Sequence, residues 1–178
     1  MEMPSSSGSY IPNKYADIDS PRGNREEYYN KYILNKSDLL FDGLTVIQEE
    51  KTNIRVFHFL DTKNTIYVAK CSIQIVNNFP VINSMWKYKP YKREPFSNIL
   101  LNFILKQYDS IESSDYHTIQ AESFWKKLLP FAFQNNYPIG FKDLSKNTVT
   151  KITNVDELSK WIEFSWPNSD VVPIIYAK

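Results

Sequence analysis

The sequence has little of what several large classes of protein need. It holds one cysteine, Cys71, so no disulfide can form within the chain, and this favours a reducing compartment. With so few thiols, its two histidines, His58 and His117, do not supply a convincing zinc site. No apolar run approaches the roughly 20 residues that cross a bilayer. The 21 basic and 20 acidic residues leave a net charge of +1, which excludes a general attraction to nucleic acid or to anionic membranes.

Glycine is scarce where phosphate-binding proteins need it. The chain has 4 glycines, and none lies between Gly43 and Gly140. Backbone N–H groups approach phosphate closely where no side chain intervenes, which is why phosphate loops are rich in glycine. Neither a Walker-type loop nor a Gly-x-Ser-x-Gly nucleophile elbow is present. The central region therefore has no glycine-rich phosphate cradle of any family.

Apolar and aromatic residues, by contrast, are abundant. Hydrophobic residues make up 42% and aromatic residues 15% of the 178 positions, which is enough for a sizeable core. Residues 1–24 are polar and rich in proline, glycine and serine, which predicts a flexible N-terminal arm that a partner could order. The arm lacks the basic and apolar regions of a secretory signal. Residues 25–178 are predicted to form a single domain.

The first half of this domain carries one helix signal and then a series of strand signals. We expect a helix from residue 25 to about residue 40, ended by Gly43. Strand-like stretches follow at residues 45–48, 54–60, 65–76 and 81–88, with turn residues between them. Successive strands joined by short turns predict an antiparallel meander.

The hydrophobic period then changes to that of a helix. Pro95 opens it, because a missing N–H costs nothing in a first helical turn. A core-facing stripe follows at helical spacing: Phe96, Ile99, Leu100, Phe103 and Ile104. Residues 110–115 form a short connecting segment, which counts as a strand in the order of elements. Asp115 or Thr118 caps a second helix, which Pro130 bends or stops.

The remaining residues read as strands around one short helix. Strands are expected at residues 137–141, 147–152 and 171–176, and a helix capped by Asn154 at residues 154–162. The fold class is therefore α/β, of the α+β kind. It combines an antiparallel meander, a helix–strand–helix unit and a C-terminal strand pair in one mixed sheet.

Residues 95–129 carry a resemblance to a known family. A helix that begins at Phe96 is followed by Ser113, Ser114 and Asp115, by the Thr118 and Gln120 pair, and then by Phe124, Trp125 and Leu128. In this stretch, and in the order of its elements, the chain resembles the GNAT-like N-acetyltransferase proteins of bacteriophages. The resemblance implies a GNAT-like mixed sheet in which acetyl-CoA lies between two splayed parallel strands. It also implies that the pyrophosphate lies at the start of the helix that follows the meander, where free N–H groups attract anions.

The acetyl-CoA loop of this family is degenerate in the chain. The family pattern is Arg/Gln-x-x-Gly-x-Gly/Ala, and residues 93–98 stand in its place. Arg93 fits, whereas Phe96 and Asn98 occupy the glycine positions, Pro95 removes a donor, and Glu94 adds negative charge. The resemblance still implies a set of cofactor-binding residues: Lys92, Arg93, Phe96, Ser97 and Asn98.

The catalytic groups of the family are also incomplete. Trp125 stands where the resemblance implies a tyrosine that protonates the leaving thiolate, and an indole donates but does not titrate usefully. The remaining candidates for an acid or a base are Asp115, Tyr116 and Glu122, together with Glu94. The carboxylates among them are equally suited to capping or surface roles.

Two further constellations have alternative interpretations. Residues 86–93 alternate four cations with Trp86, Tyr88 and Tyr91, which suits phosphates, stacked single-stranded nucleic acid, or a solvated strand end. Cys71 and His58 could form a nucleophile pair if their strands pair, although a buried and inert thiol is expected in an apolar strand.

Three functions follow from these observations. The first is a GNAT-like phage protein without ordinary acetyltransferase activity, which acts as a binding or virion-associated component for a phage or host protein. The second is an active CoA-dependent N-acetyltransferase that acts on an amine of a small molecule or of a host protein. The third is a nucleic-acid-binding module. We expect the host bacterial cytoplasm or the virion as location, acetyl-CoA as the cofactor that the resemblance implies, no metal and no membrane partner.

Overall fold

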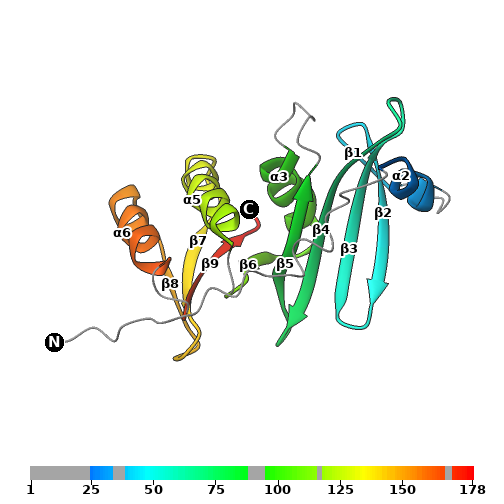
Figure 1. Ribbon diagram of the computed structural model, residues 1–178. Coiled ribbons are helices and arrows are strands. Elements are labelled where there is room, and N and C mark those ends of the chain that lie inside the picture. Colours follow the sequence, from blue (N-terminus) through cyan, green and yellow to red (C-terminus); the bar gives the residue numbers. More distant parts are fainter. Residues whose placement is uncertain (1–24, 34–38, 88–94, 116–117, 167–169) are drawn as a thin grey trace.

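A nine-stranded sheet forms the centre of the molecule, and helices flank it (Figure 1). The computed structural model describes residues 25–33, 39–87, 95–115, 118–166 and 170–178. The order of the strands in the sheet is β1-β2-β3-β4-β5-β6-β9-β7-β8. This mixed α+β architecture, in which most strands are antiparallel, confirms the class expected from the sequence. The predicted arm, residues 1–24, lies outside the described residues.

The predicted meander is confirmed, and β2, β3 and β5 are longer than expected. Consecutive strands pair antiparallel from β1 to β5. Their bounds are β1 Leu40–Phe41, β2 Leu44–Lys51, β3 Ile54–Asp61, β4 Ile66–Val76 and β5 Phe79–Lys87. Asn77 and Asn78 both have positive φ, at 51° and 68°, as the two central residues of a tight hairpin require. The turn chemistry of the sequence therefore sets the register of the β4–β5 hairpin.

The first helix is shorter than the sequence pattern predicted. α2 spans Arg25–Ile33, whereas Leu40 belongs to β1, so the expectation of a helix up to residue 40 is wrong. Asp42 and Gly43 both have positive φ and form a tight turn, which pairs Phe41 with Leu44. The hydrophobic residues before Gly43 therefore serve a hairpin and not a helix.

The helix after the meander is wider in its middle than at its ends. It begins with α3, Pro95–Asn98, continues as a π-helix, η1, over Ile99–Ile104, and ends with α4, Leu105–Gln107. The predicted apolar stripe faces the core, and Phe103 packs edge-on against Phe57, with the ring centroids 5.3 Å apart. The helix and its stripe are confirmed, whereas nothing in the hydrophobic spacing indicated the π-helical turns.

The second predicted helix continues through its proline. α5 spans Ile119–Gln134 and follows β6, Ser110–Ser113. Of the two predicted caps, Thr118 is the one used, because its hydroxyl accepts from the Ala121 N–H at 3.1 Å. Pro130 does not stop the helix. Leu129 and Ala132 on either side of it are fully buried, and their packing compensates for the one hydrogen bond that proline removes.

Three strands complete the sheet after α5, at the places where the sequence predicted strands, so this part of the sheet holds more than a strand pair. They are β7 Ile139–Asp143, β8 Thr148–Lys151 and β9 Val171–Tyr176. β7 and β8 form a hairpin, and β9 lies between β6 and β7, antiparallel to both. The short helix α6, Val155–Ser165, precedes β9, and Asn154 caps it as predicted, accepting from the Glu157 N–H at 2.9 Å.

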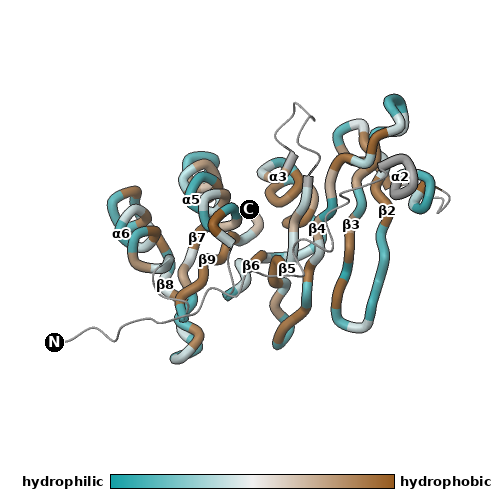
Figure 2. The backbone as a smooth tube through the Cα atoms, viewed as in Figure 1, coloured by the Kyte–Doolittle hydropathy of each residue, from teal (hydrophilic) through white to brown (hydrophobic). Residues whose placement is uncertain are grey.

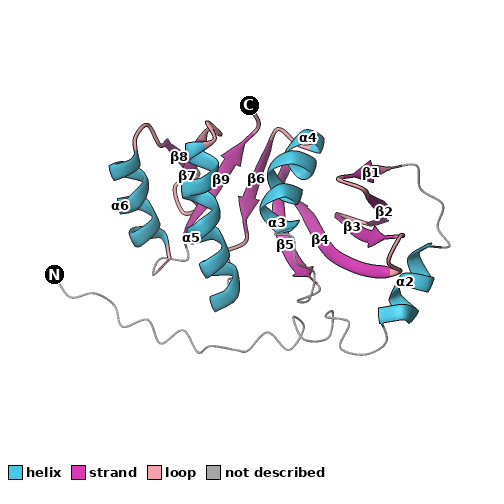
Figure 3. Cartoon of the chain, turned by 90° about the horizontal axis from the view of Figure 1, so that it is seen from above, coloured by secondary structure: helices cyan, strands magenta, loops and turns pink. Residues whose placement is uncertain are grey.

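Two hydrophobic clusters hold the helices on the sheet. The main cluster joins the helix of residues 95–107, α5 and α6 to the strands, and a smaller one joins α2 to β2, β3 and β4. Hydrophobic residues accordingly follow the strands, and the β3–β4 turn is hydrophilic (Figure 2). Seen from above, α5 and α6 lie side by side at one end of the sheet and α2 lies at the other (Figure 3). No helix in the described parts of the chain is long and apolar enough to cross a membrane.

Candidate functional site

One parallel contact interrupts the antiparallel order of the described strands. β5 and β6 run parallel, and they pair at two positions, Val81 with Glu112 and Ile82 with Ser113. β6 then ends, whereas β5 continues to Lys87 (Figure 1). We call residues 83–87 the β5 overhang. Here β5 continues after its parallel neighbour has ended.

A β-bulge marks the start of the β5 overhang. On the β4 side, Ile82 pairs with Ile73 and Ser84 pairs with Ser72, so Asn83 is the extra residue. The hydroxyls of Ser72 and Ser84 lie 2.7 Å apart, and Ser72 is buried. Bulges of this kind bend a strand and occur frequently beside binding sites. The sequence did not indicate a role for these polar residues, because a bulge has no local signature in this stretch.

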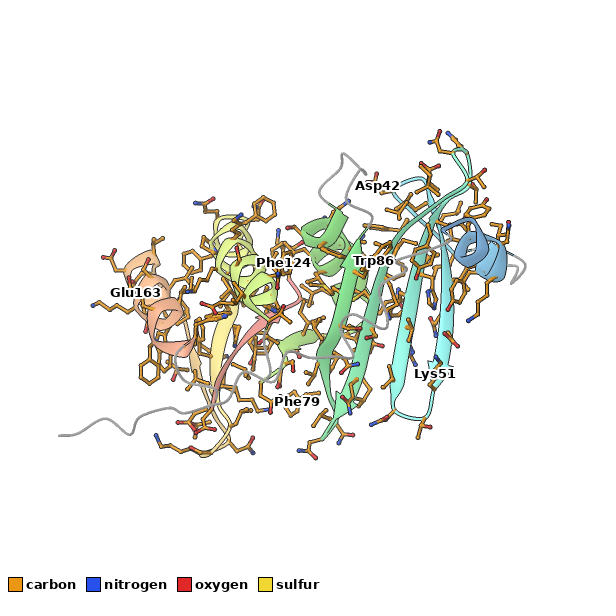
Figure 4. The ribbon with its side chains drawn as sticks, in the orientation of Figure 1. Asp42, Lys51, Phe79, Trp86, Phe124 and Glu163 are labelled. Atoms are coloured by element: carbon orange, nitrogen blue, oxygen red, sulfur yellow. The ribbon has the colours of Figure 1, made fainter. Side chains whose placement is uncertain are left out.

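The helices that follow the two parallel strands meet through an aromatic pair. Phe96 of α3 and Phe124 of α5 have ring centroids 5.9 Å apart and an interplanar angle of 76°. Both side chains are partly buried and pack on the main cluster. In Figure 4, Phe124 lies on the side of α5 that faces α3. The contact joins the first turn of α3 to the second turn of α5.

Three of the predicted cofactor-binding residues, Phe96, Ser97 and Asn98, lie in the described part of the chain. Phe96 is engaged with Phe124, as described above. Asn98 donates to the Asp42 carboxylate at 3.3 Å and accepts from the Asn102 amide at 2.6 Å. Ser97 is partly buried. Lys92 and Arg93 lie outside the described residues. The side chains at the two family glycine positions are thus engaged in contacts within the fold.

The predicted catalytic residues are not brought together. Asp115 is exposed and accepts from the Ser114 hydroxyl at 3.4 Å. Glu122 forms an ion pair with Lys126 of the next helical turn, at 2.6 Å. Trp125 is 2% exposed and belongs to the main core. Tyr116 lies outside the described residues. The geometry supports surface roles for the two carboxylates and a packing role for the indole.

The proposed Cys71 and His58 pair is wrong. Their strands do pair, but Cys71 lies opposite Phe57, and His58 lies opposite Lys70. Because successive side chains alternate between the faces of a sheet, the thiol and the imidazole point to opposite sides. Burial raises the pKa of the Cys71 thiol to about 12. The thiol is therefore inert, as the apolar strand indicated.

His58 belongs instead to a buried cluster beneath α2. Its Nδ1 lies 2.7 Å from the Tyr67 hydroxyl, its Nε2 lies 3.3 Å from the Glu49 carboxylate, and Tyr32 of α2 stacks on the ring at 3.8 Å. Because the carboxylate accepts only, Nε2 carries the proton and the tyrosine donates to Nδ1. Burial lowers the pKa of His58 to about 4, although the Glu49 carboxylate opposes this change. The imidazole is therefore neutral at pH 7.

A buried ion pair lies at the other end of the sheet. Lys142 of β7 reaches across β9 to β6, and its Nζ donates to both oxygens of Glu112, at 3.0 and 3.2 Å. The ring of Phe79 lies 4.0 Å from the same nitrogen. Glu112 is 3% and Lys142 9% exposed. The sequence carried no signal for this pair, because its partners are 30 residues apart and β9 lies between their two strands in the sheet.

The basic and aromatic run is described only at its first residues. Trp86 packs against Tyr67, with the ring centroids 5.6 Å apart, and contributes to the smaller cluster. The ring of Trp86 is partly buried in this contact. Residues 88–94 lie outside the described residues. The described residues also contain no group of three histidine, cysteine or carboxylate side chains that could hold a metal ion.

Comparisons with known proteins were made for the whole chain. No model of a known protein family matches it, and no curated protein matches it. The functional assignment therefore depends on the geometry around β5 and β6 and on the resemblance of residues 95–129.

Proposed function

We propose that the chain is a GNAT-like phage protein that does not carry out ordinary acetyl transfer and instead binds a protein of the phage or of its host. The observation that carries this proposal is the contact between Phe96 and Phe124. It joins the two helices at the place where the family resemblance puts acetyl-CoA. A component of this kind acts in the host cytoplasm or on the virion.

The order of the strands supports the GNAT-like part of the proposal. In that family the cofactor lies between two splayed parallel strands, and a helix follows the meander. Here the meander β1–β5 is followed by the helix of residues 95–107 and then by β6, which is parallel to β5 over two residue pairs. β5 continues to Lys87 after its last pair with β6, and this is the place where the family's two parallel strands separate.

The condition of the loop supports the binding part of the proposal. An anion site at a helix start needs free backbone N–H groups that a ligand can approach. Phe96 and Asn98 add side chains there, and both are engaged with α5 or with the β1–β2 turn. The residues that are present therefore do not fit the pyrophosphate of acetyl-CoA. No catalytic step is assigned to Asp115 or Glu122. Asp115 is exposed, and Glu122 forms an ion pair with Lys126.

The test is a calorimetric titration of the full chain with acetyl-CoA. We expect no saturable binding up to about 1 mM, which corresponds to a binding free energy weaker than about −4 kcal/mol. Two double variants accompany the wild type. Lys92→Ala with Arg93→Ala removes the cations of the degenerate loop. Lys146→Ala with Lys151→Ala removes two exposed cations of the β7–β8 hairpin and serves as the matched control.

Micromolar binding that is lost in the first double variant and kept in the second would overturn the proposal. The chain would then be the alternative, an active CoA-dependent N-acetyltransferase acting on an amine. One observation favours this alternative: no described strand pairs with the β5 overhang on the β6 side, so an amide-bearing arm of a cofactor could lie beside it.

A further inference from the structure

The β5 overhang has an edge that no described strand covers. On one side it pairs with β4 up to the pair of Ala69 and Lys87. On the other side its last β6 partner is Ser113, opposite Ile82. Peptide groups of a strand point alternately to its two sides, so part of the overhang directs its N–H and C=O groups away from β4. An interior strand thus has the hydrogen-bonding capacity of an edge strand.

The chemistry of this edge selects the ligand. Regularly spaced donors and acceptors on one line are matched by the amides of an extended polypeptide, which adds as a further strand. The described side chains at the bulge are neutral hydroxyl or amide groups: Ser72, Asn83 and Ser84. A neutral extended chain suits such a lining.

The two sides of the β5 overhang favour different side chains in an added strand. Met85 packs on the main cluster, as Phe96 and Phe124 do. Ser84 and Trp86 project to the opposite side, because side chains alternate along a strand. An added strand therefore has apolar residues toward the two phenylalanines and small polar residues toward Ser84.

We infer that the β5 overhang binds an extended segment of a partner protein as an added β-strand that continues the line of β6. The segment alternates apolar with small polar residues. This inference rests on the proposed function, since it names how the protein partner binds. The proposed function requires that acetyl-CoA binding has been lost. The inference requires that the edge of the β5 overhang is free to pair.

Hydrogen exchange of the free, full-length chain is the first test. We expect that alternate amides among residues 83–87 exchange at least a hundredfold faster than the amides of β4 that face β5. Protection of every amide in the overhang would overturn the inference, because the edge would then already be covered.

Selection of a displayed library of random octapeptides on the full-length chain is the second test. We expect peptides with the alternating pattern that bind with micromolar affinity and slow the exchange of the overhang amides. N-methylation of every second peptide amide on the bonding edge should weaken binding more than tenfold, and N-methylation on the other edge should not. Equal effects on both edges would overturn the inference.

The outer edge of β8 provides the control. The Ile152 N–H bonds to Ile139 of β7, so the Val149 N–H points outward, and Val149→Pro blocks pairing there without removing a bond within the sheet. Peptide binding should be unchanged in this variant, and its loss would place the site on β8 and overturn the inference. Acetyl-CoA is titrated in parallel. If neither peptide nor acetyl-CoA protects the overhang, this inference fails and the proposed function stands, whereas protection by acetyl-CoA alone overturns both.

Discussion

The two ends of the sheet bury polar groups in different ways. At the β2–β4 end, a neutral imidazole, His58, lies between the hydroxyl of Tyr67 and the stacked ring of Tyr32. At the β6–β7 end, Glu112 and Lys142 are buried as a complete ion pair. The first group avoids the cost of burying a charge by remaining unprotonated. The second offsets that cost by pairing two charges at hydrogen-bonding distance.

This difference decides how each end responds when one group is changed. Removing one partner of a buried ion pair is strongly destabilising, because the other charge stays buried without its partner. A neutral cluster loses one hydrogen bond at a time, and each bond contributes only modestly to the free energy of unfolding. The β6–β7 end should therefore be the more sensitive to substitution, and the β2–β4 end the more sensitive to pH.

The largest effect is expected for Lys142→Met. The substitution removes the donor that contacts both Glu112 oxygens and leaves a buried carboxylate without this partner. The free energy of unfolding should fall by about 3–5 kcal/mol in urea titrations. The double variant Glu112→Leu with Lys142→Met should recover most of this loss, since it removes both charges. A single variant within about 1 kcal/mol of the wild type would show that the pair is not effectively buried.

The next largest effect is expected when the pH is lowered. The free energy of unfolding should fall by about 3 kcal/mol through His58 at the β2–β4 end. His58 has its pKa lowered from 6.5 to about 4 by burial, against the opposing Glu49 carboxylate and together with Lys70 and Lys51. Between these two pH values the unfolded chain binds a proton that the folded chain does not. The contribution of His58 to the free energy of unfolding is therefore fully present above pH 6.5 and is lost progressively as the pH falls toward 4.

Urea titrations at pH 7, 5.5 and 4.5 measure this loss, and His58→Gln isolates it. The variant should have a shallower dependence on pH over this range, because it has no imidazole to titrate. Identical slopes in the variant and the wild type would assign the pH dependence to other groups.

The smallest effect is expected for Tyr67→Phe. The substitution removes the donor to His58 Nδ1 and leaves that buried acceptor without this bond, so the free energy of unfolding should fall by about 1–2 kcal/mol. Tyr32→Phe is the matched control, because it keeps the ring that stacks on His58 and removes a hydroxyl from the same cluster. It should stay within about 0.5 kcal/mol of the wild type. A larger loss for Tyr32→Phe than for Tyr67→Phe would contradict the assigned hydrogen bond.

Local chemistry predicted the elements of the fold well. Asn77 and Asn78 marked a hairpin turn, Pro95 the start of a helix and Asn154 a cap, and each feature depends on residues that are neighbours in sequence. Pro130 was misjudged because the burial of the residues around it outweighs the missing hydrogen bond. Local rules fail where tertiary packing supplies the larger free energy.

The candidate site was less accessible to prediction. Phe96 and Phe124 were identified from the family resemblance, but their contact depends on how two helices are placed by two parallel strands. The bulge at Asn83 and the pairing of Glu112 with Lys142 likewise depend on register between strands. Register is a property of the assembled sheet, so a sequence without aligned relatives does not reveal it.

The position of β9 has a consequence for the synthesis of the chain. β9 is the last of the nine strands to be translated, yet it lies between β6 and β7, which are made much earlier. Until residues 171–176 have been added, the place between β6 and β7 is a gap, because β9 is the strand that pairs with both. The two parts of the sheet are therefore joined by the last strand of the described chain. A product whose translation stops before residue 171 would keep that gap open and would be prone to aggregate through it.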